Sequence, residues 1–153
     1  MSKDKIPKVP VPMLPARPVS GDTNSEKIVQ SWIWQRIGRF LLPGDIVLAE
    51  SGTAQFGMSD ADFPDDVIYI TQLLYSSIGY AVGSCLGAAL ALQEKKNGSA
   101  IDYMQDGGAH NKGQGRVILI VGDGSLQMTV QEIGTMVKMG LTPIMFAHVF
   151  TKD

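Results

Sequence analysis

The chain has 153 residues and a formal net charge of −2, with 44% apolar and 18% charged residues. These values are typical of a soluble globular protein of single-domain size that can bury a moderate core. No cluster of lysine and arginine is interleaved with aromatic residues, so we expect no nucleic-acid partner.

The amino-terminal segment 1–22 is predicted to be a proline-rich linker. Proline removes backbone donors and favours extended geometry. The segment has lysines but no apolar stretch of the kind that a secretion signal requires, so we expect the protein in the cytoplasm. A linker at the start of a chain suggests that a preceding domain is missing. Five of the eight prolines lie here, at Pro7, Pro10, Pro12, Pro15 and Pro18.

A partial domain over 23–153 is predicted to open with a helix over 23–42. Thr23 and Glu26 have the spacing of a capping box. Trp32 and Trp34 could stack on a ligand, but helical spacing favours a packing role. The apolar stripe of this helix consists of Val29, Trp32, Ile33, Ile37 and Phe40.

A buried strand is predicted over 45–50, followed by a small polar loop over 51–54. The loop carries Ser51 and Thr53, which in isolation indicate ordinary turn hydrogen bonds. In doubly wound sheets, however, ligands lie across the carboxyl ends of the strands, so these hydroxyl groups are also candidates for binding. A further short strand is predicted over 67–70.

The stretch 71–93 is uncharged and has the length of a membrane span, with Gly79, Gly83 and Gly87 four residues apart. Its polar residues dilute the hydrophobicity, and neither end has a cluster of positive and aromatic anchors. We therefore predict a buried helix whose glycines allow close packing on a sheet or a partner subunit. Cys85, the only cysteine, is predicted to be a buried thiol in a reducing compartment.

The segment 95–115 is polar, glycine-rich and without period, and is predicted to be a flexible loop. His110 lies within it and His148 lies beyond it. Neither has a second histidine or cysteine at ligand spacing, so no transition-metal site is predicted.

The strongest pattern lies between Arg116 and Gly140. It predicts a buried strand over 116–121, a turn over 122–125 and a one-sided helix over 126–137, with a last strand over 144–149. Unpaired N–H groups at such a turn favour anions. Because Asp123 would repel an anion directly, a Mg²⁺ ion bridging it to a diphosphate is one interpretation. The alternative is a tight connection without a ligand, which the residue types alone favour.

Other nucleotide and hydrolase signatures are missing from the sequence. No glycine-rich loop ends in Gly-Lys-Ser/Thr, and Gln127 occupies the third glycine position of a dinucleotide-binding pattern. No G-x-S-x-G elbow is present.

Three passages carry a specific resemblance: GDIVLAESGTAQFG, LLYSSIGYAVGSCLGAALA and RVILIVGDGSLQMTVQEIGTMVKMGLTP. They resemble the carboxyl-terminal diphosphate-binding domain of fungal-type pyruvate decarboxylases, which are thiamine diphosphate-dependent 2-oxo acid decarboxylases. The resemblance implies an α/β fold with an incomplete doubly wound parallel sheet. It also implies thiamine diphosphate and Mg²⁺ as cofactors.

The resemblance further implies roles for individual residues. Asp123 matches the family's Mg²⁺ ligand. Gly124 and Ser125 match residues that hold the diphosphate, and Ser51 and Thr53 match hydroxyl positions that line the cofactor.

Two more positions match groups that hold the thiamine. Ser76 matches a position, usually glycine in the family, whose carbonyl receives the aminopyrimidine. Ile78 matches the apolar wedge that bends the thiamine. The bend brings the amino nitrogen of the thiamine close to the reacting carbon of the same molecule. No catalytic proton-transfer residue of the family is matched.

Departures from the family pattern leave two hypotheses open. The spacing places Phe150 where the family has a Mg²⁺-binding asparagine, and the family's amino-terminal domain is absent. The first hypothesis is a fragment of a carboxy-lyase that acts on a 2-oxo acid only when it is joined to another chain. The complete enzyme would be a homo-oligomer. This chain alone would then be inactive and would bind its cofactor weakly. The second is a catalytically dead relative that acts at most as an interaction module.

Overall fold

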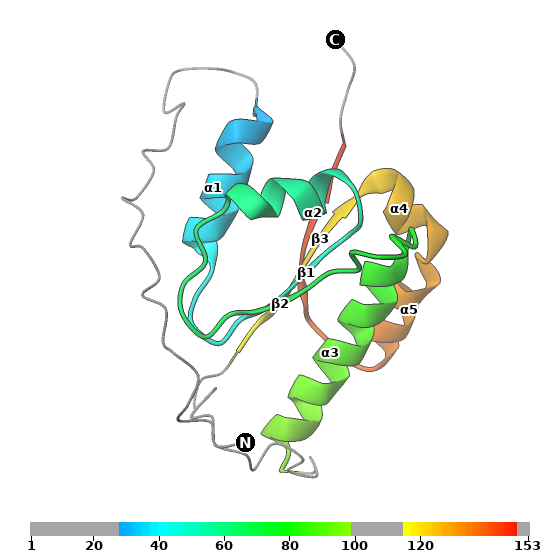
Figure 1. Ribbon diagram of the computed structural model, residues 1–153. Coiled ribbons are helices and arrows are strands. Elements are labelled where there is room, and N and C mark those ends of the chain that lie inside the picture. The colour runs from blue at the N-terminus through cyan, green and yellow to red at the C-terminus, as the bar shows by residue number, and fades with distance from the viewer. Residues whose placement is uncertain (1–27, 99–114, 150–153) are drawn as a thin grey trace, which may run out of the picture.

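The computed structural model describes residues 28–98 and 115–149. Four short strands form one sheet in the order β2-β1-β3-β4, and every neighbouring pair is parallel. The predicted α/β class and parallel sheet are therefore confirmed (Figure 1). The strands are β1 (Ile46–Ala49), β2 (Ile68–Ile70), β3 (Val117–Gly122) and β4 (Ile144–His148).

Helices cover both faces of the sheet, as a doubly wound arrangement requires (Figure 1). Helices α1 and α2 lie over one face, and α3 and α5 lie over the other. The helical elements are α1 (Gln30–Phe40), α2 (Thr53–Gly57), the 3-10 turn η2 (Met58–Asp60), α3 (Tyr80–Lys96), α4 (Asp123–Met128) and α5 (Gln131–Lys138).

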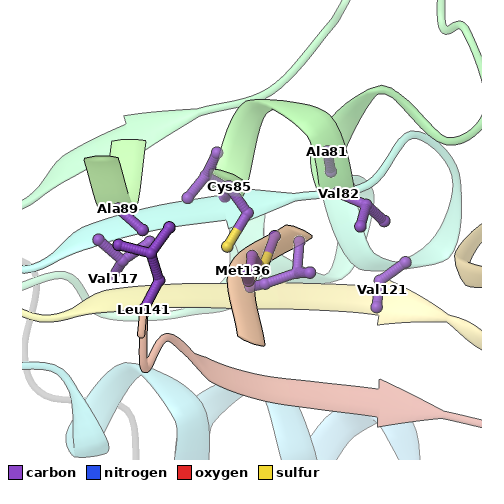
Figure 2. Close-up of a cluster of buried hydrophobic side chains, with 10 residues drawn as sticks. Ala81, Val82, Cys85, Ala89, Val117, Val121, Met136 and Leu141 are labelled. Carbon is purple, nitrogen blue, oxygen red and sulfur yellow. The ribbon is translucent and has the colours of Figure 1, made fainter. Parts of the chain in front are cut away.

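The strand period of two divides the core into two clusters. On β3, Leu119 and its alternate neighbours face α3 and α5, while Ile118 and Ile120 face α1 and α2. Both faces of β1 and β3 are therefore buried, which explains their continuous apolar sequence. Figure 2 shows the first cluster, in which Cys85 and Met136 lie among the small side chains of α3 and the valines of β3.

Cys85 is fully buried, and burial raises the pKa of its thiol to about 12. The predicted structural thiol is therefore confirmed, since a protonated and inaccessible thiol is a poor nucleophile.

Several predicted boundaries were wrong. The first helix begins at Gln30 with Val29 as its cap, so the capping box at Thr23 and Glu26 is not its start and lies outside the described residues. The loop expected over 51–54 instead runs into helix α2, which begins at Thr53. Lys95 and Lys96 belong to α3 rather than to the predicted flexible loop, of which 99–114 lies outside the described residues. The linker 1–22 also lies outside them.

The expected helix over 71–93 is only partly correct, because residues 71–79 form a loop. Gly79 has a φ of +90° and precedes the first residue of α3. Gly83 and Gly87 do not provide close packing in this chain, since a Cβ atom at either would meet no atom within 4 Å. In the described residues no helix is long and apolar enough to cross a membrane.

The unit after β3 also differs from its prediction. Helix α4 starts at Asp123, inside the expected turn, and the expected single helix is broken at Thr129 and Val130 into α4 and α5. The strand-to-helix junction at Asp123 was nevertheless placed correctly to within a turn.

Candidate functional site

The order of the strands places a topological switch point at one end of the sheet, and we call the region beside it the crevice. The chain passes from β1 outward to β2 on one side, and from β3 outward to β4 on the other. Between β1 and β3 the connections therefore diverge, and in open α/β sheets ligands bind at such a switch point, outside the carboxyl ends of the strands. In the register, Ala49 lies opposite Ile120, and the N–H of Glu50 donates to the carbonyl of Ile120 at 2.9 Å.

Five of the predicted site residues follow these two strands. Ser51 is buried two residues after the end of β1, and Thr53 is exposed at the first residue of α2. Asp123 and Gly124 are exposed at the start of α4, and Ser125 is half-buried beside them. The strand alignment thus brings the two groups, about 70 residues apart in sequence, to the same edge of the sheet.

The other two predicted residues, Ser76 and Ile78, lie on the loop between β2 and α3, and both are exposed. The loop is tied to the end of β1, because the Ser51 hydroxyl donates to the carbonyl of Gln72 at 3.3 Å. It is also tied to the end of α4, because the Thr129 hydroxyl donates to the carbonyl of Gly79 at 2.9 Å. Segments from β1, β2 and β3 therefore converge at the crevice.

Ser76 has a left-handed backbone, with a φ of +47°. Residues other than glycine adopt this backbone conformation at a cost, because their Cβ atom approaches the following carbonyl. This geometry gives a physical reason for the glycine that the resemblance expects at this position. The Ser76 hydroxyl donates locally to the carbonyl of Leu73 at 3.3 Å.

His148 was not among the predicted site residues, although the structure places it at this edge. It lies opposite Gly122 in the β3–β4 register, and its ring meets Trp34 edge to face at a centroid distance of 5.9 Å. Burial lowers the pKa of His148, and the negative charge of Asp123 partly opposes this change. Only the pairing of β3 with β4 brings His148 to Asp123, so local sequence gives no signal for it.

Replacing Asp123 with asparagine is expected to lower the pKa of His148 further, because the charge that favours the imidazolium is lost. The imidazole proton signals in an NMR titration measure this shift. Asp65→Asn, before β2 at the opposite end of the sheet, is the matched control. An unchanged or raised pKa in Asp123→Asn would contradict the electrostatic contact.

The lowered pKa of His148 also makes the stability of the folded chain depend on pH. Because the pKa of His148 is lower in the folded chain than its ordinary value of 6.5, the unfolded chain binds the proton more readily. This residue therefore reduces the stability as the pH falls below about 6.5, and Asp123→Asn should increase that loss.

The donor set for a metal at this edge is small. Among residues 28–98 and 115–149, no group of three or more His, Cys, Asp or Glu side chains is placed to hold a metal ion. At the start of α4, Asp123 is an exposed carboxylate, the kind of oxygen donor that Mg²⁺ prefers. Phe150 lies outside the described residues.

Comparison with known proteins agrees with this architecture. Residues 50–149 match the family model described as thiamine pyrophosphate enzyme, C-terminal TPP binding domain. The match covers more than half of the chain, and the chain therefore belongs to this family.

Within the family, the chain is similar to fungal pyruvate decarboxylases. It is 44% identical over 140 residues to pyruvate decarboxylase of Kluyveromyces marxianus, which covers 90% of this chain and 22% of the relative. It is 44% identical over 150 residues to isozyme 2 of Saccharomyces cerevisiae, covering 94% and 24%. With the Aspergillus terreus enzyme the identity is 45% over 124 residues, covering 81% and 19%. The chain thus spans less than a quarter of the length of these relatives.

Proposed function

We propose that this chain carries the diphosphate-binding half of the active site of a 2-oxo acid decarboxylase of the pyruvate decarboxylase type. The observation that carries the proposal is the topological switch point, where the exits of β1 and β3 bring Ser51 and Thr53 to the same edge of the sheet as Asp123, Gly124 and Ser125. The family membership gives the cofactor class, and the similarity to pyruvate decarboxylases gives the class of reaction.

Each residue has a physical role in this proposal. Gly124 and Ser125 present backbone N–H groups and a hydroxyl to the diphosphate, which suits an anion at a strand-to-helix junction. Asp123 would supply one oxygen to Mg²⁺, and Thr53 is exposed at the same edge, at the exit of β1. When bound, thiamine diphosphate supplies the electron sink for decarboxylation.

The loop before α3 holds the other end of the cofactor in this proposal. The carbonyl of Ser76 accepts from the aminopyrimidine, and the exposed apolar side chain of Ile78 packs against the thiamine. The 2-oxo acid binds only in the complete enzyme, where a second subunit of a cytoplasmic homo-oligomer closes the pocket.

Cofactor titration by calorimetry tests the site directly. Because Asp123 is the one position that matches a Mg²⁺ ligand of the family, we expect a dissociation constant above roughly 100 μM for Mg²⁺-thiamine diphosphate, equivalent to about −5.5 kcal/mol or weaker. Asp123→Ala is expected to abolish the remaining binding. Asp65→Ala removes the same charge at the amino end of the sheet and should bind as the wild type does.

Two results would refute the site assignment. One is micromolar binding by the wild-type chain, and the other is binding that Asp123→Ala leaves unchanged. The first would show that the Mg²⁺ site is more complete than the match at Asp123 implies, and the second that the diphosphate is held somewhere other than the start of α4.

A second candidate function, an interaction module without catalysis, is favoured by one surface feature. Leu73, Leu74 and Tyr75 are 69%, 93% and 86% exposed in the loop before α3. Three consecutive exposed apolar residues are typical of a contact with another protein surface. Absence of cofactor binding together with self-association or partner binding that Leu74→Ser removes would favour this candidate.

A further inference from the structure

Glu50 is an acidic residue in the interior whose position is not explained by metal or cofactor binding. It follows β1 directly and is 1% exposed. A buried carboxylate is costly unless its oxygens accept hydrogen bonds. Its Oε2 accepts from the N–H groups of Gly79 and Ala81, both at 3.2 Å, and its Oε1 accepts from the N–H of Ser51 at 3.0 Å.

These bonds place Glu50 at the start of α3. The cap residue Gly79 has no side chain, so the first turn of the helix has no local side-chain acceptor from that position. Glu50, just after β1 and 29 residues before Gly79, supplies an acceptor instead, and its negative charge suits the positive end of the helix. A long-range side chain thus performs the capping role that local sequence usually fills.

Gly79 is also held from its other side. Its carbonyl accepts from the Thr129 hydroxyl at 2.9 Å, and a Cβ atom added to it would lie 3.1 Å from the Cβ of Met128. Its φ of +90° favours glycine in addition. The end of the loop is therefore fixed between the exit of β1 and the end of α4.

Apolar packing does not hold the rest of the loop, since Leu73, Leu74 and Tyr75 are exposed. Polar contacts hold it instead. The side-chain oxygen of Gln72 accepts from the N–H of Ser77 at 2.6 Å, and the Gln72 carbonyl accepts from Ser51, the residue next to Glu50. The conformation of the loop thus depends on a few hydrogen bonds at the exit of β1.

We propose that Glu50 is a positioning residue that sets the loop over 72–79 at the crevice and so places the Ser76 carbonyl and the Ile78 side chain for the thiamine end of the cofactor. This inference rests on the proposed function. A carboxylate is required because both of its oxygens accept, whereas a glutamine would direct an NH₂ group at one or two of the three backbone N–H donors, depending on its orientation.

The test compares Glu50→Gln with Glu94→Gln, the same chemical change at an exposed position near the end of α3. Amide hydrogen exchange is measured at Gly79 and Ala81, with the amides of β3 as a measure of global stability. Glu50→Gln should accelerate exchange at Gly79 and Ala81 by about tenfold or more and leave β3 unchanged. Glu94→Gln should change neither.

Calorimetry then compares the binding of the whole cofactor with the binding of its diphosphate part. With Mg²⁺ present, Glu50→Gln is expected to weaken the binding of thiamine diphosphate about fivefold or more. The binding of inorganic diphosphate should weaken less than about twofold, because in the proposed function it is held at Asp123, Gly124 and Ser125. Thr129→Val, which removes the hydroxyl bond to Gly79, should show a smaller effect of the same kind and serves if Glu50→Gln does not fold.

The outcomes distinguish this inference from the proposed function. Unchanged exchange at Gly79 and Ala81 would overturn the role of Glu50, and so would an equal loss of both ligands with faster exchange throughout β3. If the wild-type chain binds neither ligand, the proposed function fails, and the exchange rates alone decide whether Glu50 holds the loop.

Discussion

Replacing Asp45 with alanine is expected to lower the free energy of unfolding by about 3 kcal/mol, because it removes a buried acceptor and leaves several donors unpaired. Asp45 is buried at the amino end of β1. Its Oδ2 accepts from Arg116 Nη2 at 2.6 Å and from the N–H of Leu42 at 2.8 Å, and its Oδ1 accepts from Arg116 Nε at 3.0 Å.

This cluster joins three parts of the chain. Arg116 also donates to the carbonyl of Phe40 at 3.0 Å, and its guanidinium lies 4.6 Å from the centre of the Phe40 ring. The end of α1, the start of β1 and the start of β3 are therefore linked at the end of the sheet opposite the crevice. The change should reduce stability without altering the chemistry at the site.

Urea denaturation measures the expected loss, with Asp65→Ala as the control for removal of an exposed carboxylate. The pH dependence gives a second measure. Burial opposes ionisation of Asp45, but the hydrogen bonds from Arg116 and Leu42 outweigh it and lower the pKa. A lowered pKa stabilises the fold above the ordinary value of 3.8, and this stability is lost as the pH falls through the folded-state pKa. Equal stability of wild type and Asp45→Ala at neutral pH would contradict the prediction.

Gly57→Ala is expected to destabilise the fold by about 3 kcal/mol, through overpacking alone. A Cβ atom at Gly57 would overlap the ring of Trp34. Trp34 is buried against the sheet and its ring also meets His148, so it has little room to move. The φ of Gly57 is −64°, which alanine adopts freely, so the backbone contributes no penalty.

Gly83→Ala is the matched control, because Gly83 lies inside α3 with no atom within 4 Å of an added Cβ. It should stabilise the chain by about 0.5–1 kcal/mol, since alanine is the better helix former. Thermal unfolding of both variants measures the contrast. In a Trp34→Leu background the cost of Gly57→Ala should fall by about half or more. An equal cost in both backgrounds would show that the indole is not the obstacle.

The sequence alone determined the fold class and the central unit of the domain. The apolar run 117–121 is buried on both faces and so carries the signal of a central parallel strand, which does not depend on distant contacts. The glycine and aspartate at its end likewise located the junction at Asp123. The family resemblance was confirmed, while the seven site residues that it implied stay predictions.

Only the tertiary structure decided how distant segments meet at the crevice. The helix expected over 71–93 begins only at Tyr80, where Glu50, the residue after β1, accepts hydrogen bonds from the first backbone N–H groups of α3. His148 reaches Asp123 through the β3–β4 pairing, and Gly79 reaches Thr129 across 50 residues. Hydrogen bonds between residues far apart in sequence leave no periodic signal. The contacts of Glu50, Gln72 and His148 therefore depend on the alignment of the strands and could not be predicted from the local sequence.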